Sequence, residues 1–319
     1  MSGIGACVPE RILTNDDLAG MVDTNDEWIT SRTGIRERHL AAPGETTSDL
    51  AAVAAQRALE DAKLPAEALD LIIVATATAD YPFPSTASIV QDRLSARRAA
   101  AFDLSAACSG FIYALVTGAQ FIRTGAYRHV LVIGAETLSR ITNWEDRSTC
   151  ILFGDGAGAA VLGPAAEGFG LLGAELGSDG SGRELLKVEK NGAGPGQITM
   201  SGNEVFKFAV RILPESVRRV VAAAGVEVSD LDWLFAHQAN SRILDAAGRR
   251  LGLENEKVFS VVHKYGNTSA ASIPIALAEA QQEGRLHPGN LLALVGFGAG
   301  LTWASCLIRW GGALPVGPK

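Results

Sequence analysis

Two parts of this chain resemble each other at a constant interval of 162 residues. Three pairs of segments match at that interval: 68–75 with 230–237, 114–115 with 276–277, and 130–134 with 292–296. Each match is weak alone, but a single interval at three separate places rarely arises by chance. The pattern therefore predicts two similar halves, residues 1–163 and 164–319, and not two unrelated domains.

Within each half, apolar segments of strand length alternate with amphipathic segments of helix length. We expect helices at 47–63, 86–96, 109–124, 204–224, 241–251 and 269–282. We expect strands at 70–76, 101–106, 130–135, 159–162, 232–236, 258–262, 291–297 and 302–309. Such alternation is typical of a buried, mostly parallel sheet covered by helices on both faces. Two such halves predict an α/β protein with a layered α/β/α/β/α sandwich.

Composition and charge exclude several classes of protein. Apolar residues make up 47% of the chain and charged residues 20%, which excludes a disordered chain, a coiled coil and a collagen-like fibre. The net charge of −7 argues against non-specific binding of nucleic acid. Two uncharged stretches, 104–122 and 291–308, are as long as a membrane-spanning helix. Their polar residues and glycines argue against a membrane span, and we interpret the second as two buried strands joined by a glycine-rich turn.

The beginning of the sequence, MSGIGACVPER, lacks a basic region followed by an apolar core, so it does not resemble a secretory signal. The four cysteines are too widely spaced for a zinc knuckle or a CxxC redox pair. These observations favour a cytoplasmic protein with reduced thiols.

Cys108 follows a strand-like segment and small residues, and it precedes a predicted helix. Free N–H groups at a helix N-terminus favour a thiolate, and the small neighbours leave room for a substrate. The ordinary alternative is a buried structural cysteine, which is the commoner fate of a free thiol. Cys7, Cys150 and Cys306 lack this setting, and we expect them to be structural.

Two polar residues in the second half are further candidates. His237 directly follows an apolar strand, where open α/β sheets place functional groups, although a buried structural histidine fits equally well. Asn267 follows a glycine and precedes a run of small residues, where its amide can donate a hydrogen bond into a pocket or simply cap a helix. Among the other histidines only His263 rivals these candidates, because it lies close to Asn267 in the sequence.

Two glycine-rich segments give weaker signals. Gly296-Phe-Gly-Ala-Gly300 can present backbone N–H groups to a ligand as an oxyanion hole, but a phosphate nest or a plain turn fits too. Gly154-Asp-Gly-Ala-Gly158 contains an acidic side chain that would repel a phosphate, so we expect a structural turn there. The sequence has no P-loop, no metal-ligand cluster and no GxGxxG fingerprint after a strand.

Taken together and in order, these segments resemble the thiolase superfamily, and specifically the β-ketoacyl-[acyl-carrier-protein] synthase III family. The similar segments are 23–39, 107–111, 153–159, 201–207, 237–240 and 265–272. The resemblance extends over nearly the whole chain and implies a thiolase-like five-layered sandwich. It also implies a Cys-His-Asn site, which favours Asn267 over His263. Two departures are an N-terminus a few residues short and Ala299 in place of a glycine found in some relatives.

The resemblance implies a two-step acyl transfer without a metal or organic cofactor, in which a CoA thioester is a substrate. Cys108 takes an acyl group from acyl-CoA, and the N–H groups of Cys108 and Ala299 hold the oxyanion. His237 and Asn267 then stabilise the enolate formed when malonyl-[acyl-carrier protein] loses CO₂. Attack of that enolate on the acyl-cysteine gives a β-ketoacyl-carrier protein and starts type II fatty-acid synthesis.

Further contacts are implied by position in the family. Trp28 and Arg147 are expected to sandwich the CoA adenine, and Arg32 and Thr24 to lie near its phosphates. The pantetheine channel is expected to be lined by Gly202, Asn203, Phe206 and Ala239. A local basic patch for the acidic carrier protein is expected from Lys207, Arg211, Arg242, Arg249 and Arg250, although a solvated charged face is the plainer interpretation. Phe83 is expected to reach the acyl pocket of a partner subunit, which implies a homodimer.

Two other functions stay open. A relative in a polyketide pathway would load an unusual starter, or would transfer acyl groups to oxygen or nitrogen without condensation. A non-catalytic acyl-binding subunit belongs to a different class, and the presence of Cys108 argues against it. The sequence does not indicate which starter acyl group is preferred.

Overall fold

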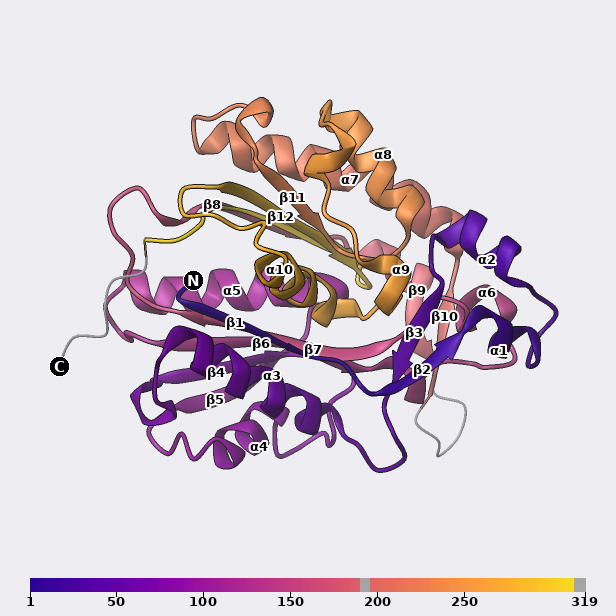
Figure 1. Ribbon diagram of the computed structural model, residues 1–319, viewed down its shortest axis with the longest axis horizontal. Coiled ribbons are helices and arrows are strands. Elements are labelled where there is room, and N and C mark those ends of the chain that lie inside the picture. The colour runs from indigo at the N-terminus through magenta and orange to yellow at the C-terminus, as the bar shows by residue number, and fades with distance from the viewer. Residues whose placement is uncertain (190–195, 313–319) are drawn as a thin grey trace.

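The computed structural model describes residues 1–189 and 196–312 and has five layers (Figure 1). Two sheets lie face to face with a layer of helices between them and helices on both outer faces. The first sheet has the order β1 (Gly3–Cys7), β7 (Asp155–Leu162), β6 (Val130–Thr137), β4 (Leu71–Ala75), β5 (Ala100–Leu104). The second has the order β8 (Gly170–Ser178), β13 (Thr302–Arg309), β12 (Leu291–Gly298), β11 (Trp233–Ala236).

The two sheets have corresponding orders and strand directions. In the first sheet β4 is parallel to β5 and β6, and β7 is antiparallel to β6 and β1. In the second, β11 is parallel to β12, and β13 is antiparallel to β12 and β8. This arrangement gives the thiolase-like sandwich that the sequence predicts.

The helices are assigned to layers by the side chains that they bury. The central layer consists of α5 (Gly110–Arg123) and α10 (Ser272–Gln282), and both helices bury apolar side chains against both sheets. On the outer face of the first sheet lie α3 (Thr47–Ala62) and α4 (Thr86–Arg93). On the outer face of the second lie α7 (Gly202–Ala223) and α8 (Ser241–Leu251). Burial on two sides explains the long uncharged segment that contains α5.

Smaller elements extend the sandwich beside the site. They are β2 (Arg11–Thr14), α1 (Asn15–Ala19), α2 (Asp26–Thr33), β3 (Glu37–Leu40), α6 (Arg147–Cys150), β9 (Leu186–Glu189), β10 (Gln197–Met200) and α9 (Val262–Tyr265). Figure 1 shows them gathered at one end of the layers. Two 3₁₀ turns, η2 (Ala107–Ser109) and η7 (Ser269–Ala271), precede the two central helices. Neither described part of the chain contains a helix long and apolar enough to cross a membrane.

Two sequence expectations are wrong. The segment 258–262 is not a strand: it makes one bridge, Leu234 to Val258, at the place that β5 occupies in the first sheet. The ladder stops because the Val261 N–H donates to the Gln238 side chain, 2.9 Å away, after β11 has ended at Ala236.

The segment Gly154–Gly158 is not a turn either, because β7 begins at Asp155. A Cβ at Gly158 would lie 2.6 Å from Pro274, so glycine here lets helix α10 pack directly on the strand. The Asp155 carboxylate is buried and accepts hydrogen bonds from the Ser139 and Ala41 backbone, each at 2.8 Å. Asp155 therefore stabilises the start of β7, so the segment has a structural role although it is not a turn.

Candidate active site

Cys108, His237 and Asn267 line one pocket of about 390 Å³ between the two halves of the chain. Cys108 comes from η2, His237 follows β11, and Asn267 lies just before η7. These loops follow the carboxyl ends of parallel strands or precede the central helices, which is where α/β sheets form ligand sites. The structure thus brings together three residues that are far apart in the sequence.

Cys108 lies in the turn that leads into α5, after Ala107, whose φ of 46° is left-handed. Its side chain is 9% exposed. A Cβ at Gly298 would lie 2.6 Å from the Cys108 nitrogen, so the end of β12 is in backbone contact with the cysteine. Ala299 follows directly, which puts the turn after β12 beside the Cys108 amide. Burial raises the pKa of the Cys108 thiol to about 12, opposed mainly by a hydrogen bond with Ser269.

His237 is buried, and its Nδ1 lies 2.7 Å from the Ser272 hydroxyl. The Gln238 N–H donates to the same hydroxyl oxygen at 3.3 Å. The Ser272 hydroxyl has one proton to give, and when it donates that proton to Nδ1 the imidazole proton lies on Nε2. Burial lowers the pKa of His237 to about 3, so the ring is neutral at physiological pH. A neutral ring with Nε2–H can donate one hydrogen bond into the pocket.

Asn267 is held from both sides. Its N–H donates to the Leu152 carbonyl at 2.8 Å, and its own carbonyl accepts from Gly154 at 3.0 Å. Its side-chain Oδ1 accepts from the Ser269 N–H at 2.9 Å. Since a backbone donor must face the amide oxygen, the Nδ2 end is left to donate. His237 and Asn267 can therefore supply two uncharged donors to one oxygen.

A buried carboxyl group beside these residues was missed by the sequence interpretation. Glu136 is inaccessible to solvent and accepts a 3.0 Å hydrogen bond from the Ser269 hydroxyl. Its other oxygen accepts from the Thr78 hydroxyl at 2.6 Å and the Ala77 N–H at 3.0 Å. Burial raises the pKa of Glu136 to about 7, and these hydrogen bonds oppose that rise. The signal was a lone acidic residue in the apolar run 130–137.

Trp28 lines the pocket, and two arginines lie against its ring. The guanidinium carbons of Arg32 and Arg147 each lie 4.5 Å from the Trp28 ring centroid. Arg147 also donates to the Asp23 carbonyl at 2.7 Å. Thr24 is close in sequence, and its hydroxyl oxygen is buried without a hydrogen-bond partner among the described residues. The region around Trp28 therefore combines a flat aromatic ring, two guanidinium groups and the Thr24 hydroxyl.

The residues predicted to bind substrate, carrier protein or a partner subunit divide into two groups by whether they line this pocket. The pocket is lined by Trp28, Arg32, Gly202, Asn203, Phe206, Ala239 and Arg242. The following do not line it: Thr24, Phe83, Arg147, Lys207, Arg211, Arg249, Arg250 and Ala299. Phe83 is 85% exposed on the loop between β4 and α4. His263 lies outside the pocket lining as well.

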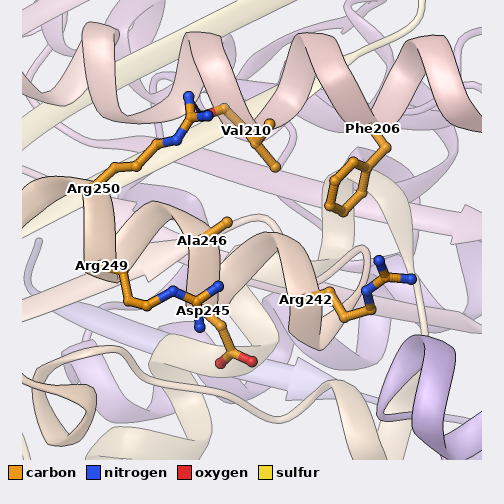
Figure 2. Close-up of a pocket in the computed structure, with 7 residues that line it drawn as sticks. All are labelled: Phe206, Val210, Arg242, Asp245, Ala246, Arg249 and Arg250. Atoms are coloured by element: carbon orange, nitrogen blue, oxygen red, sulfur yellow. Dashed lines mark hydrogen bonds between the residues drawn. The ribbon is translucent and has the colours of Figure 1, made fainter.

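A groove of about 550 Å³ between α7 and α8 adjoins the pocket (Figure 2). Phe206 and Arg242 line both, so the groove leads to the pocket entrance. Figure 2 shows Arg242, Arg249 and Arg250 along α8, with Asp245 among them. These side chains give the groove an excess of positive charge.

The cations around this groove differ in their partners. Lys207 pairs with Glu204 at 2.6 Å, and Arg211 with Glu215 at 3.5 Å. Arg250 donates to the Val210 carbonyl at 2.8 Å. The Arg249 side chain makes no hydrogen bond or ion pair with any residue that the structure describes. The pairing of Lys207 and Arg211 weakens their share of the predicted basic patch and leaves Arg249 as its most available cation.

Comparison with known proteins gives one consistent result. Two family models, both described as 3-oxoacyl-[acyl-carrier-protein] synthase III, match residues 102–180 and, for the C-terminal model, 221–310. A protein of Desulfitobacterium hafniense named beta-ketoacyl-[acyl-carrier-protein] synthase III is 56% identical over 97% of this chain and 96% of its own. A protein of the same name from Geobacillus kaustophilus is 54% identical over 97% and 98%.

Solved structures agree. The 3-oxoacyl-[acyl-carrier-protein] synthase III of Aquifex aeolicus superposes with a TM-score of 0.94 and 50% identity, covering 97% of this chain and 98% of its own. The priming β-ketosynthase of the R1128 polyketide pathway superposes with a TM-score of 0.92 and 36% identity, covering 96% and 94%.

Proposed function

The chain belongs to the β-ketoacyl-[acyl-carrier-protein] synthase III family of condensing acyltransferases, and from this premise we propose the reaction that its pocket performs. The enzyme joins an acyl-CoA starter to malonyl-[acyl-carrier protein] and releases CoA, CO₂ and a β-ketoacyl-carrier protein. The observation that carries this proposal is the pocket in which a cysteine at a helix start faces two oriented, uncharged donors.

In the first step, the Cys108 sulfur attacks the acyl-CoA thioester. The N–H groups of Cys108 and Ala299 are proposed to bind the oxyanion of the tetrahedral intermediate, because the end of β12 lies against the Cys108 amide. Collapse of the intermediate expels CoA and leaves an acyl-cysteine.

In the second step, the Nε2–H of His237 and the Nδ2–H of Asn267 donate to the thioester carbonyl of malonyl-carrier protein. Loss of CO₂ leaves an enolate on that oxygen, and preorganised donors of this kind contribute about 3–4 kcal/mol each. The enolate carbon then attacks the acyl-cysteine. A neutral His237 suits this role, because it donates a hydrogen bond to the enolate oxygen and keeps its proton.

Trp28 and Arg147 are proposed to hold the CoA adenine, with Arg32 and Thr24 near the phosphates. In this structure the Arg147 guanidinium stacks on Trp28 itself. Adenine would take that place against the ring, with Arg147 on its outer face, since aromatic and guanidinium planes stack alike. Gly202, Asn203, Phe206 and Ala239 would line the path of the pantetheine arm to Cys108.

The carrier protein is proposed to dock on the groove between α7 and α8. Arg242, Arg249 and Arg250 would meet its acidic surface, with Lys207 and Arg211 at the margin. The support for this surface is its position, since Phe206 and Arg242 belong to both groove and pocket.

A homodimer through the edge of the first sheet is proposed for the assembly. β5 is an edge strand, Phe102 on it is partly exposed, and Tyr81 and Phe83 lie exposed on the preceding loop. Unpaired edges and apolar side chains of this kind mark protein interfaces. A Phe102→Asp variant that is monomeric by light scattering, beside a dimeric parent, supports the proposal; a monomeric parent contradicts it. The cytoplasm is proposed as the compartment, on the basis of the four free cysteines.

The test of the proposed function is intact mass after incubation with a panel of acyl-CoAs, with and without malonyl-carrier protein. We expect an acyl adduct in the parent and none in Cys108→Ala. Adduct retained in Cys108→Ala refutes the nucleophile. Release of a β-keto product with malonyl-carrier protein separates condensation from simple acyl transfer. The panel also addresses the polyketide alternative, which the similarity to the R1128 enzyme keeps relevant: an unusual preferred starter would favour it.

A further inference from the structure

Trp28, Arg32 and Arg147, the nucleotide clamp of the proposed function, come from two short elements. Trp28 and Arg32 lie on α2, whereas Arg147 is the first residue of α6. α6 is a single turn, closed by a hydrogen bond of 2.9 Å from the Cys150 N–H to the Asp146 carbonyl. Helices this short do not hold their shape in water by backbone bonds alone. The geometry of the clamp therefore depends on what fixes α2 and α6 relative to each other.

Arg38 on β3 lies beneath these two elements and is completely buried. Burial lowers its pKa to about 10, so the guanidinium is charged at neutral pH. No carboxylate of the described residues lies within ion-pair distance of it. A buried charge without a partner of opposite sign is costly, whereas an apolar side chain of similar volume carries no such cost. Stability alone therefore does not account for an arginine at this position.

The guanidinium of Arg38 donates to three uncharged oxygens from three segments of the chain. Nη1 donates to the Leu13 carbonyl at 3.1 Å and to Asn15 Oδ1 at 2.9 Å. Nη2 donates to the Ile151 carbonyl at 2.8 Å. Ile151 directly follows α6, so this bond fixes the end of the turn that begins with Arg147. Because a guanidinium is planar and rigid, it also fixes the distance from that turn to Asn15.

Asn15 extends this contact to α2. The residue is buried, and its Nδ2 donates to Asp26 Oδ1 and to the Ile35 carbonyl, each at 2.8 Å. Asp26 is the first residue of α2, and Ile35 lies just after the helix ends. Arg38 can only donate and the Asp26 carboxylate can only accept, so the Asn15 amide has a single orientation. Asn15 thus joins Arg38 to both ends of the helix that carries two parts of the clamp.

We propose that Arg38 is a positioning residue that sets the spacing of the nucleotide clamp. Its hydrogen bonds run through Asn15 to α2 in one direction and to Ile151 at the end of α6 in the other. The guanidinium thereby holds the backbone of Trp28 opposite that of Arg147 before CoA arrives, so less ordering is required on binding. The proposal rests on the nucleotide-binding role of the clamp in the proposed function. Arg38 itself does not line the pocket.

A different role for the buried cation is long-range attraction of the CoA phosphates. Arg38→Lys separates the two roles, because lysine keeps the charge but lacks the planar fork that spans two segments. Positioning predicts that lysine does not restore CoA binding. Attraction predicts that lysine restores it in full, and that result overturns the proposal.

Isothermal titration calorimetry with CoA measures the clamp in the full chain. Arg38→Met keeps the stem, which lies beside Gly154 and Gly266, and removes the donors. Its Kd for CoA should rise about fivefold, as expected when the Trp28 stack is lost, and Arg38→Lys should show nearly the same rise. KM for the preferred acyl-CoA should rise by the same factor. kcat, and KM for acyl-pantetheine, which lacks the nucleotide, should change less than about twofold.

A double-mutant cycle with Trp28→Ala tests whether Arg38 acts through the clamp. In the Trp28→Ala background, Arg38→Met should weaken CoA binding by less than about a further twofold, because the stack that it positions is already gone. Multiplicative effects of the two changes overturn the proposal. An equal rise in KM for acyl-pantetheine also overturns it, because that result indicates damage to the pocket as a whole.

Asn15→Asp keeps the proposal testable if Arg38→Met does not fold. An aspartate still accepts from Arg38 but cannot donate to Asp26 or Ile35, so the link to α2 is broken. Kd for CoA should rise in this variant too, and an unchanged Kd contradicts the proposal. Arg57→Met is the matched control, because it removes an arginine that donates to the Ala6 carbonyl at 2.6 Å on the outer face of the first sheet. Its Kd for CoA should equal that of the parent, and a rise like that of Arg38→Met overturns the proposal.

The failure of this inference and of the proposed function can be told apart. If Trp28→Ala weakens CoA binding and the Arg38 variants do not, only the positioning role fails. If Trp28→Ala leaves Kd for CoA unchanged, the clamp fails and the positioning role fails with it. The condensation itself is measured separately, by release of the β-keto product.

Discussion

The Ser272 hydroxyl lies 2.7 Å from His237 Nδ1 and also accepts the Gln238 N–H at 3.3 Å. One side chain at the start of α10 thus orients a histidine at the end of β11, and its donation to Nδ1 would select the Nε2–H tautomer. The imidazole is left with a donor at Nε2, which the decarboxylation step requires. Helix α10 and the loop after β11 are thus joined by a hydrogen bond.

Ser272→Ala should therefore impair condensation more than acylation. Without the hydroxyl, His237 can adopt the other tautomer and present an acceptor to the thioester carbonyl. We expect kcat for condensation to fall about tenfold, in line with one lost hydrogen bond of about 1.4 kcal/mol. The rate of Cys108 acylation, measured by single-turnover mass spectrometry, should stay within about twofold. Ser272→Thr, which keeps a hydroxyl, serves as the control, and equal loss in both steps would contradict the assignment.

Trp28→Ala should raise KM for acyl-CoA about fivefold and leave kcat nearly unchanged, because it removes about 1 kcal/mol of stacking that persists through the reaction. An acyl-pantetheine substrate lacks the adenine and provides the control. Steady-state kinetics with both substrates make the comparison. If KM for acyl-pantetheine rises as much as KM for acyl-CoA, Trp28 acts on the pocket as a whole and not on the nucleotide.

Arg249→Glu should weaken the use of malonyl-carrier protein about tenfold through KM, since the Arg249 side chain in the groove between α7 and α8 has no ion pair, hydrogen bond or ring contact with a described residue. The effect should shrink at high salt. Acyl-CoA use should be unchanged. Arg285→Glu reverses an exposed arginine that pairs with Glu283, and it controls for net charge. A similar loss with both substrates for Arg249→Glu would argue against a docking role.

Acid should destabilise the fold partly through His237. Its folded pKa of about 3 lies below the unfolded value of 6.5, so the unfolded chain binds more protons between those pH values. The contribution of His237 to stability is therefore complete above about pH 6.5 and declines as the pH falls. From about pH 7.5 to about pH 5 it should cost about 2 kcal/mol. Urea denaturation of the parent and His237→Gln at both pH values measures this, and an equal acid loss in the variant would remove His237 as the cause.

Much of the fold could be predicted because the spacing of apolar residues along the sequence indicates which positions are buried. The helix 241–251 coincides with α8, and the segment 291–308 forms two buried strands, as expected. The expected strand at 258–262 failed for a reason that no local pattern contains. A side chain from another loop, Gln238, takes the hydrogen bond that a neighbouring strand would have offered. Likewise, the glycines at 154–158 serve a strand because α10 packs on them.

The site was predictable only where a residue type stands out. Cys108, His237 and Asn267 are unusual in their settings, and the structure brings them into one pocket. Ser269 and Ser272 are ordinary serines in a run of small residues, and their importance comes from residues distant in sequence: Ser269 meets Glu136 of the first half, and Ser272 meets His237. Ion pairing also escaped the sequence interpretation, because Glu204 and Glu215 neutralise two cations of the expected patch.

The contact between Gly298 and the Cys108 amide has a consequence for anyone who wishes to engineer this enzyme. A methyl group at 298 would collide with backbone, which cannot move aside as a side chain can. The distance between the nucleophile and β12 is thus set by main chain against main chain. In a saturation library, position 298 should admit almost no replacement. Evolution towards new starters is then confined to the walls of the pocket, because the nucleophile itself has no room to shift.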